Sequence, residues 1–171
     1  MTPTAVTGRC LCGAVKFEIT LPTKWCAHCH CSMCRRAHGA AFVTFCGVEA
    51  DRFRILEGAD QLTRYASSPK AWRSFCNVCG STLLFEGDRW PDEVHVVRAN
   101  IDGEIDRKPQ AHCYFTDHVD WVDVSDGLPR LKPTPRGNKK ARPPGFAPKY
   151  EGRSPFLCAT SRSLLLDARI S

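Results

Sequence analysis

The chain has 171 residues, of which 43% are hydrophobic and 25% are charged, and its formal net charge is +6 at pH 7. This length suits one domain with a single core, and the composition excludes a fibrous repeat and a wholly disordered chain. The first residues, MTPTAVTGRC, lack the basic start and apolar run of a signal peptide. No stretch approaches the roughly 18 apolar residues of a membrane-spanning helix. We therefore expect a soluble, cytoplasmic protein.

The positive charge is concentrated near the C-terminus. Residues 1–131 hold 15 Lys or Arg against 16 Asp or Glu, a balance of −1, whereas residues 132–171 hold 9 against 2, a balance of +7. Because the first segment is nearly neutral, a nucleic-acid-binding face on the fold itself is not expected.

Short apolar or β-branched runs, each ended by turn residues, follow one another from residue 8 to about residue 130. The segment 14–21, AVKFEITL, alternates apolar and polar residues with the period of a half-buried strand. Further strands are predicted at residues 40–48, 53–58, 81–87 and 93–101. Only residues 32–39, SMCRRAHG, are typical of a helix, with Ser32 as a possible N-cap and Gly39 just past the end. The pattern predicts a mainly β, mostly antiparallel fold with one short helix.

After Leu131 the composition changes to a segment rich in Pro, Lys and Arg, KPTPRGNKKARPPGFAPKYEGRSP. Such a segment cannot bury enough apolar surface to offset the entropy lost on ordering. We therefore place a domain boundary near Leu131 and expect residues 132–171 to form a flexible basic tail.

Eleven cysteines are the most informative residues of the chain. Cytosolic thiols are kept reduced, the count is odd, and the thiols around residue 30 are too close in sequence to pair readily with one another. The spacing therefore favours metal binding over disulfides. Three closely spaced groups stand out: Cys10 and Cys12; Cys29, Cys31 and Cys34; and Cys76 and Cys79.

Two of these groups are pairs that can together surround one metal ion. Zinc prefers four tetrahedral thiolate or imidazole ligands, usually offered in pairs from tight turns. Cys76 and Cys79, followed by Gly80, resemble a zinc knuckle, because glycine lets the backbone turn toward the sulfurs. Cys10 and Cys12 are the candidate partner pair. The sequence thus predicts one closed zinc site.

The remaining group, Cys29, Cys31 and Cys34, has no fourth cysteine at the same spacing. A zinc with three protein ligands keeps a fourth position for water or substrate, as in catalytic sites. Cys26 is an alternative member, since CAHC is itself a C-x-x-C sequence. His30 is expected to point away from the neighbouring thiols, behind the ligands or at the surface. Chemistry is therefore predicted at this triplet.

The cysteines outside these spacings, Cys26, Cys46, Cys113 and Cys158, are by default small buried hydrophobes. His112 lies on a probable strand and is expected to be packed and hydrogen-bonded. Neither set is expected to bind a metal.

The motifs GRCLCGAVKF, CHCSMCRRAHGA, RSFCNVCGSTLLF and VVRANIDGE, followed by PQAHCYF and a tryptophan, resemble the glutathione-dependent formaldehyde-activating enzyme family in order and approximate spacing. The resemblance covers residues 7–131, and the combination of three cysteine groups is highly specific. It implies the β-tent fold, also found in centromere protein V-like proteins, with small antiparallel sheets around zinc sites. It also implies two Zn²⁺ per chain: a structural zinc on Cys10, Cys12, Cys76 and Cys79, and a catalytic zinc on Cys29, Cys31 and Cys34.

The activity that the resemblance implies is that of a carbon-sulfur lyase. The namesake reaction joins glutathione, a small-molecule thiol, to formaldehyde and forms S-hydroxymethylglutathione. Arg35, Arg36 and Arg73 are candidates by charge for binding the two carboxylates of glutathione. No membrane partner is expected.

Two other functions fit parts of the sequence. A non-catalytic zinc-stabilised module would bind protein or nucleic acid through the basic tail, residues 132–171. Thiol redox catalysis would use an exposed cysteine of low pKa, with Cys113 or Cys26 as the candidate. The first alternative requires the tail for binding, and the second requires a reactive thiol outside the metal groups.

Overall fold

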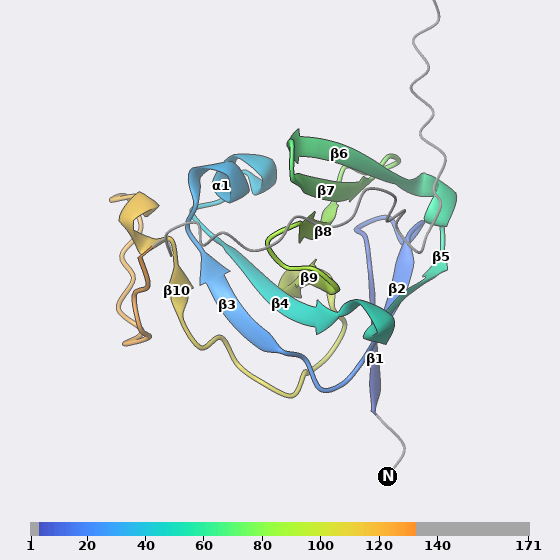
Figure 1. Ribbon diagram of the computed structural model, residues 1–171, viewed down its shortest axis with the longest axis horizontal. Coiled ribbons are helices and arrows are strands. Elements are labelled where there is room, and N and C mark those ends of the chain that lie inside the picture. Colours follow the sequence, from blue (N-terminus) through green and yellow to red (C-terminus); the bar gives the residue numbers. More distant parts are fainter. Residues whose placement is uncertain (1–3, 133–171) are drawn as a thin grey trace, which may run out of the picture.

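The computed structural model describes residues 4–132 of the chain (Figure 1). Its one α-helix, α1, spans Ser32–His38, and four single turns of 3-10 helix span Ala50–Arg52, Ala59–Gln61, Arg98–Asn100 and Phe115–Asp117. The strands are β1 (Ala5–Arg9), β2 (Lys16–Thr20), β3 (Trp25–Cys29), β4 (Val43–Glu49), β5 (Phe53–Glu57), β6 (Leu62–Ser68), β7 (Ala71–Cys76), β8 (Thr82–Gly87), β9 (Glu93–Val97) and β10 (His112–Cys113). The described part of the chain is mainly β, as the sequence predicted.

The strands form two sheets. The smaller has the order β1-β2-β5, and the larger has the order β10-β3-β4-β9-β8-β7-β6. All strand pairs are antiparallel except β10 and β3, which run parallel with His112 opposite His28 and Cys113 opposite Cys29. The expected antiparallel arrangement therefore has this one exception, because a long connection after β9 returns the chain to the outer edge of β3 (Figure 1).

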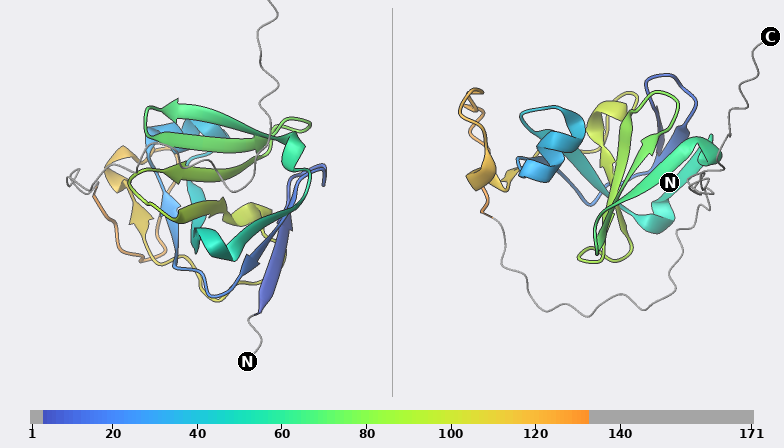
Figure 2. Two further views of the ribbon diagram at one scale, coloured as in Figure 1. Left: turned by 45° about the vertical axis from the view of Figure 1, so that its right-hand side comes forward. Right: turned by 90° about the horizontal axis from the view of Figure 1, so that it is seen from above.

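The hydrophobic core joins the two sheets. In β2, Phe17 and Ile19 are fully buried while the side chain of Lys16 is exposed, as the predicted alternation requires. All five residues of β9 are buried, because this strand lies between β4 and β8 in the middle of the larger sheet. The two views of Figure 2 show the smaller sheet standing at one side of the larger one.

Helix α1 begins differently from the prediction. Its N-cap is Cys31, not Ser32, and the Cys31 sulfur accepts a hydrogen bond from the Cys34 amide at 3.3 Å. The sulfur thus takes the place that a serine hydroxyl usually holds at an N-cap. Gly39 ends the helix in the left-handed conformation (φ 59°), as predicted.

One predicted strand is shorter than expected, and part of the chain lies outside the described residues. The strand predicted at residues 93–101 ends at Val97, where the chain enters a 3-10 turn. Residues 133–171 of the predicted tail, which include Cys158, lie outside the described residues. Between residues 4 and 132, the structure contains no helix that is long and apolar enough to cross a lipid bilayer.

Candidate functional site

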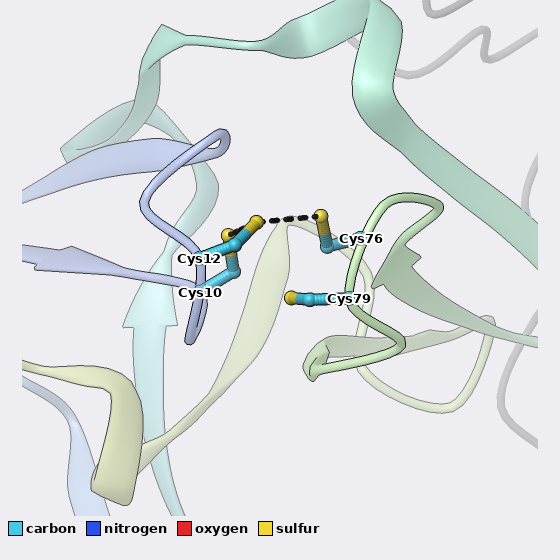
Figure 3. Close-up of side chains that lie close together, drawn as sticks. All are labelled: Cys10, Cys12, Cys76 and Cys79. Atoms are coloured by element: carbon cyan, nitrogen blue, oxygen red, sulfur yellow. Dashed lines mark hydrogen bonds between the residues drawn. The ribbon is translucent and has the colours of Figure 1, made fainter.

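Four cysteines from two turns converge in one cluster (Figure 3). Cys10 and Cys12 lie in the connection between β1 and β2, Cys76 ends β7, and Cys79 lies in the turn before β8. Their sulfur atoms all lie within 4.8 Å of one another, with 3.5 Å between Cys10 and Cys12 and 3.9 Å between Cys12 and Cys76. We call this group the four-cysteine cluster. Four thiols at such distances can surround one metal ion.

Hydrogen bonds in the two turns support the thiolate form of Cys79. Gly13 and Gly80 adopt left-handed conformations with φ of 78° and 75°, which lets each turn fold back on its sulfurs. The Ser81 hydroxyl lies 3.2 Å from the Cys79 sulfur and accepts a hydrogen bond from the Leu11 amide at 3.0 Å. Hydrogen bonding from Ser81 lowers the pKa of Cys79 to about 5. Because metals bind thiolates, these hydrogen bonds prepare Cys79 for metal binding.

A second group, the cysteine triplet, contains Cys29 at the end of β3, Cys31 at the N-cap of α1 and Cys34 in its first turn. Their sulfur atoms also lie within 4.8 Å of one another. Hydrogen bonds with Cys29 and Cys34 lower the pKa of Cys31 to about 2, and the contact with Cys31 raises the pKa of Cys29. The triplet therefore readily holds one negative charge, whereas three thiolates at this distance require a cation.

Arg73 on β7 supplies positive charge to the triplet. Its Nη2 atom lies 3.5 Å from the Cys34 sulfur, and its guanidinium stacks over the Phe85 ring at 5.0 Å. The residue is only 7% exposed, and its Nη1 atom is buried with no hydrogen-bond partner within the described part of the chain. The sequence proposed Arg73 for binding a carboxylate; the structure places it beside a metal-ligand candidate with one donor group still free.

A hollow of about 410 Å³ lies between α1 and strands β6 to β8, and we call it the α1–β7 hollow. Arg73 is part of its wall and so connects it to the triplet. Arg36 also lines the hollow, whereas Arg35 does not and instead donates a hydrogen bond to the His30 carbonyl oxygen at 3.1 Å. The lining residues are Met33, Arg36, Ala37, Tyr65, Ser67, Arg73, Phe75 and Thr82. Of the three arginines suggested by the sequence, two therefore line one cavity.

A chain of hydrogen bonds lies behind the triplet. His30 Nε2 is 2.8 Å from His112 Nδ1, and His112 Nε2 is 3.0 Å from both carboxylate oxygens of Asp126. Both histidines are 1% exposed, so His30 is not at the surface, and His112 is packed and hydrogen-bonded as expected. Burial lowers the pKa of His30 to about 4, which keeps the ring neutral. Sequence reasoning missed Asp126, because no motif marks it in its irregular segment.

The other cysteines do not join the triplet. Cys26 and Cys46 face each other across β3 and β4 with their sulfurs 3.6 Å apart in the core, so the alternative that placed Cys26 among the metal ligands is wrong. Burial raises the pKa of Cys113. With Cys26 buried and Cys113 held in the thiol form, neither has the exposed thiolate that redox catalysis requires.

Comparisons with known proteins agree with this arrangement. Residues 5–117 match the family model described as "Glutathione-dependent formaldehyde-activating enzyme". A protein of Halomonas elongata described as a putative glutathione-dependent formaldehyde-activating enzyme is 31% identical over 125 residues, which cover 68% of this chain and 79% of that protein. An uncharacterised lyase of Schizosaccharomyces pombe is 32% identical over 78 residues, which cover 46% of this chain and 55% of that protein.

The fold has a relative among solved structures. A crystal structure of a Rhodobacter sphaeroides protein superimposes with a TM-score of 0.52 at 26% sequence identity, covering 73% of this chain and 99% of that chain. The family match spans most of the described residues and includes both groups of clustered cysteines. The chain therefore belongs to the glutathione-dependent formaldehyde-activating enzyme family.

Proposed function

We propose that the protein binds two zinc ions, a structural one in the four-cysteine cluster and a reactive one at the cysteine triplet. The donor set supports this proposal, because sulfur ligands grouped within 4.8 Å suit the tetrahedral coordination of zinc. Four thiolates close the first site completely. Among residues 4–132, no fourth His, Cys, Asp or Glu joins the triplet, which leaves room there for an external ligand.

The proposed activity is that of a carbon-sulfur lyase acting on a thiol adduct, with glutathione and formaldehyde as reactants. The observation that carries it is the position of Arg73, which contacts Cys34 and also lines the α1–β7 hollow. A thiol whose body occupies this hollow would lie against Arg73, which in turn contacts Cys34 of the triplet. The family membership supports glutathione as the thiol.

The chemistry requires a thiolate and a positive environment. Zinc held by three thiolates would supply positive charge that favours the deprotonated form of an incoming thiol. The Arg73 guanidinium adds a fixed positive charge beside Cys34 and so reduces the repulsion between the ligand thiolates and the incoming one. The wall formed by the buried Arg73 and the partly buried Phe75 would orient the thiol.

The reaction balances without a further reagent. The thiolate sulfur forms a bond with the carbonyl carbon of formaldehyde, the π electrons of the C=O bond move to oxygen, and this oxygen takes up the proton that the thiol lost. The product is the S-hydroxymethyl thioether. In the reverse direction the C–S bond breaks and formaldehyde leaves, which is the lyase reaction.

The test combines zinc content with the rate of adduct formation. Elemental analysis of the wild type should give two zinc ions per chain, and Cys31→Ser should retain one. Exchange NMR of glutathione with formaldehyde should show a rate above the uncatalysed reaction for the wild type only. Cys46→Ala removes a core thiol outside both groups and should keep both zinc ions and the rate. Two zinc ions with only the uncatalysed rate in the wild type would overturn the lyase proposal.

A further inference from the structure

The lining of the α1–β7 hollow is positively charged. Two of its lining residues, Arg36 and Arg73, are cationic, and none is acidic. We infer that this hollow binds the carboxylate-bearing body of the thiol and that Arg36 makes the site selective for anionic thiols. The inference rests on the proposed function in taking a thiol as the ligand, but its binding test does not require catalysis.

Some basic residues of the fold are paired with carboxylates. Lys16 and Arg54 pair with Glu57 and Glu18, each at 2.8 Å. Arg36, in contrast, is exposed on α1, and its side chain has no hydrogen bond or ion pair within residues 4–132. A guanidinium that is left free at the wall of a cavity is available for a carboxylate of the ligand.

The unpartnered donor of Arg73 points to the same ligand chemistry. A buried N–H group without an acceptor is unfavourable, and the Nη1 atom of Arg73 is such a group. Its Nη2 atom is engaged with Cys34, and the side chain lines the hollow. A carboxylate or peptide carbonyl of a bound ligand would supply the missing acceptor.

The size and the lining of the hollow favour a peptide-like thiol over a very small one. A volume of about 410 Å³ lies in the range of ligand pockets, which is roughly 300–1,000 Å³. Met33, Tyr65 and Phe75 offer apolar surface, and the Ser67 hydroxyl offers a polar group. Thr82 donates a hydrogen bond to the Ala37 carbonyl oxygen at 3.1 Å and thereby fixes the distance between α1 and β8 across the hollow. A small neutral thiol would leave much of this volume unfilled.

The inference is tested with S-methylglutathione, which keeps both carboxylates but has no free thiol to bind a metal. Isothermal titration calorimetry with the full chain should show binding to the wild type. Arg36→Ala should weaken this binding about tenfold, the effect of losing one charge-assisted hydrogen bond. Arg9→Ala is the matched control, because Arg9 is an exposed arginine on β1 and does not line the hollow.

Kinetics add a second readout that a purely structural effect would not give. Arg36→Ala should raise KM for glutathione by a larger factor than it lowers kcat, and it should raise KM for neutral 2-mercaptoethanol by a smaller factor than KM for glutathione. Equal binding of S-methylglutathione by the wild type and Arg36→Ala, or no binding by the wild type at millimolar concentration, would overturn the inference. Binding that depends on Arg36 in a protein without turnover would instead uphold the inference and overturn only the lyase proposal.

Discussion

His30 and His112 face each other with 2.8 Å between His30 Nε2 and His112 Nδ1, in the core behind the triplet. His112→Ala should lower the free energy of unfolding by about 2–4 kcal/mol, because it removes the ring that is hydrogen-bonded to His30 Nε2 and opens a cavity. Since His30 lies between Cys29 and Cys31, we also expect faster loss of zinc from the triplet to a chelator. Urea denaturation and a metal-release assay measure the two effects.

Asp126 stands at the other end of the hydrogen-bonded row His30–His112–Asp126, and its substitution can be compared with that of His112. Asp126 is 44% exposed, so Asp126→Asn should destabilise less than His112→Ala. Asp123→Asn changes an exposed aspartate of the same segment, for which no hydrogen bond or ion pair occurs within residues 4–132, and should have no effect. Zinc release from His112→Ala at the wild-type rate would contradict the idea that these hydrogen-bonded side chains position the triplet.

The two cysteine groups should differ in their effect on stability. The four-cysteine cluster joins turns that are 64 residues apart, measured from Cys12 to Cys76, whereas the triplet lies within a single short segment. A metal that closes a long loop restricts the unfolded chain more, and its binding energy contributes directly to folding. Cys12→Ser should therefore lower the melting temperature well below that of Cys31→Ser. Thermal unfolding followed by circular dichroism measures both, and equal melting temperatures would contradict the expectation.

Gly47 is required by the packing of Trp25 on the neighbouring strand. A Cβ atom at residue 47 would lie 2.3 Å from the indole ring, and the ring cannot swing away easily because its Nε1 atom donates a hydrogen bond to Glu93 at 2.8 Å. Gly47→Ala should destabilise the fold by about 1–3 kcal/mol. Gly87→Ala is the control, since its Cβ would meet no atom closer than 3.4 Å. Similar denaturation midpoints for the two variants would contradict this assignment.

Glu93 should make stability depend on pH in the acidic range. Burial by itself raises the pKa of Glu93, but hydrogen bonds from His95, Lys24 and Trp25 outweigh burial and bring the pKa to about 2, below its ordinary value of 4.5. Because the folded-state pKa is depressed, the contribution is present above pH 4.5 and is lost as the pH falls toward 2. The shift corresponds to about 3 kcal/mol at most.

Urea denaturation of the wild type and Glu93→Gln between pH 6 and pH 3 measures this contribution. The difference between the two proteins should shrink as the pH falls, while acid effects on other carboxylates and on the cysteines are common to both and cancel. A difference that stays constant over this range would show that Glu93 does not titrate with a depressed pKa.

The sequence predicted the elements that show a clear residue pattern. Alternation in β2 and the β-branched run of β9 mark their strands, and the flanking Gly39 marks the end of α1. β3 and β7 were missed because their sequences, WCAHC and AWRSFC, show no alternation, and they become strands through pairing with β4 and β8. Parallel pairing of β10 depends on a long connection that no local signal specifies.

The cysteine groups were predictable because metal ligands must lie close together, and short spacings such as C-x-x-C keep them close in any fold. The surroundings of the triplet were not predictable from the sequence. Arg73 reaches Cys34 from a position 39 residues later, and Asp126 reaches His112 from an irregular segment. Such contacts depend on the order of strands in the sheet, which residue spacing alone does not determine.

The cap of helix α1 connects the cysteine triplet to the α1–β7 hollow. A helix of seven residues is not stable alone, and this one begins at a candidate ligand, Cys31, whose sulfur accepts the Cys34 amide. Met33, Arg36 and Ala37, which line the hollow, stand on the same helix. Zinc at the triplet would therefore order the hollow before any thiol arrives. Thermodynamic linkage makes this coupling reciprocal, so a ligand that fills the α1–β7 hollow should in turn raise the affinity of the triplet for zinc.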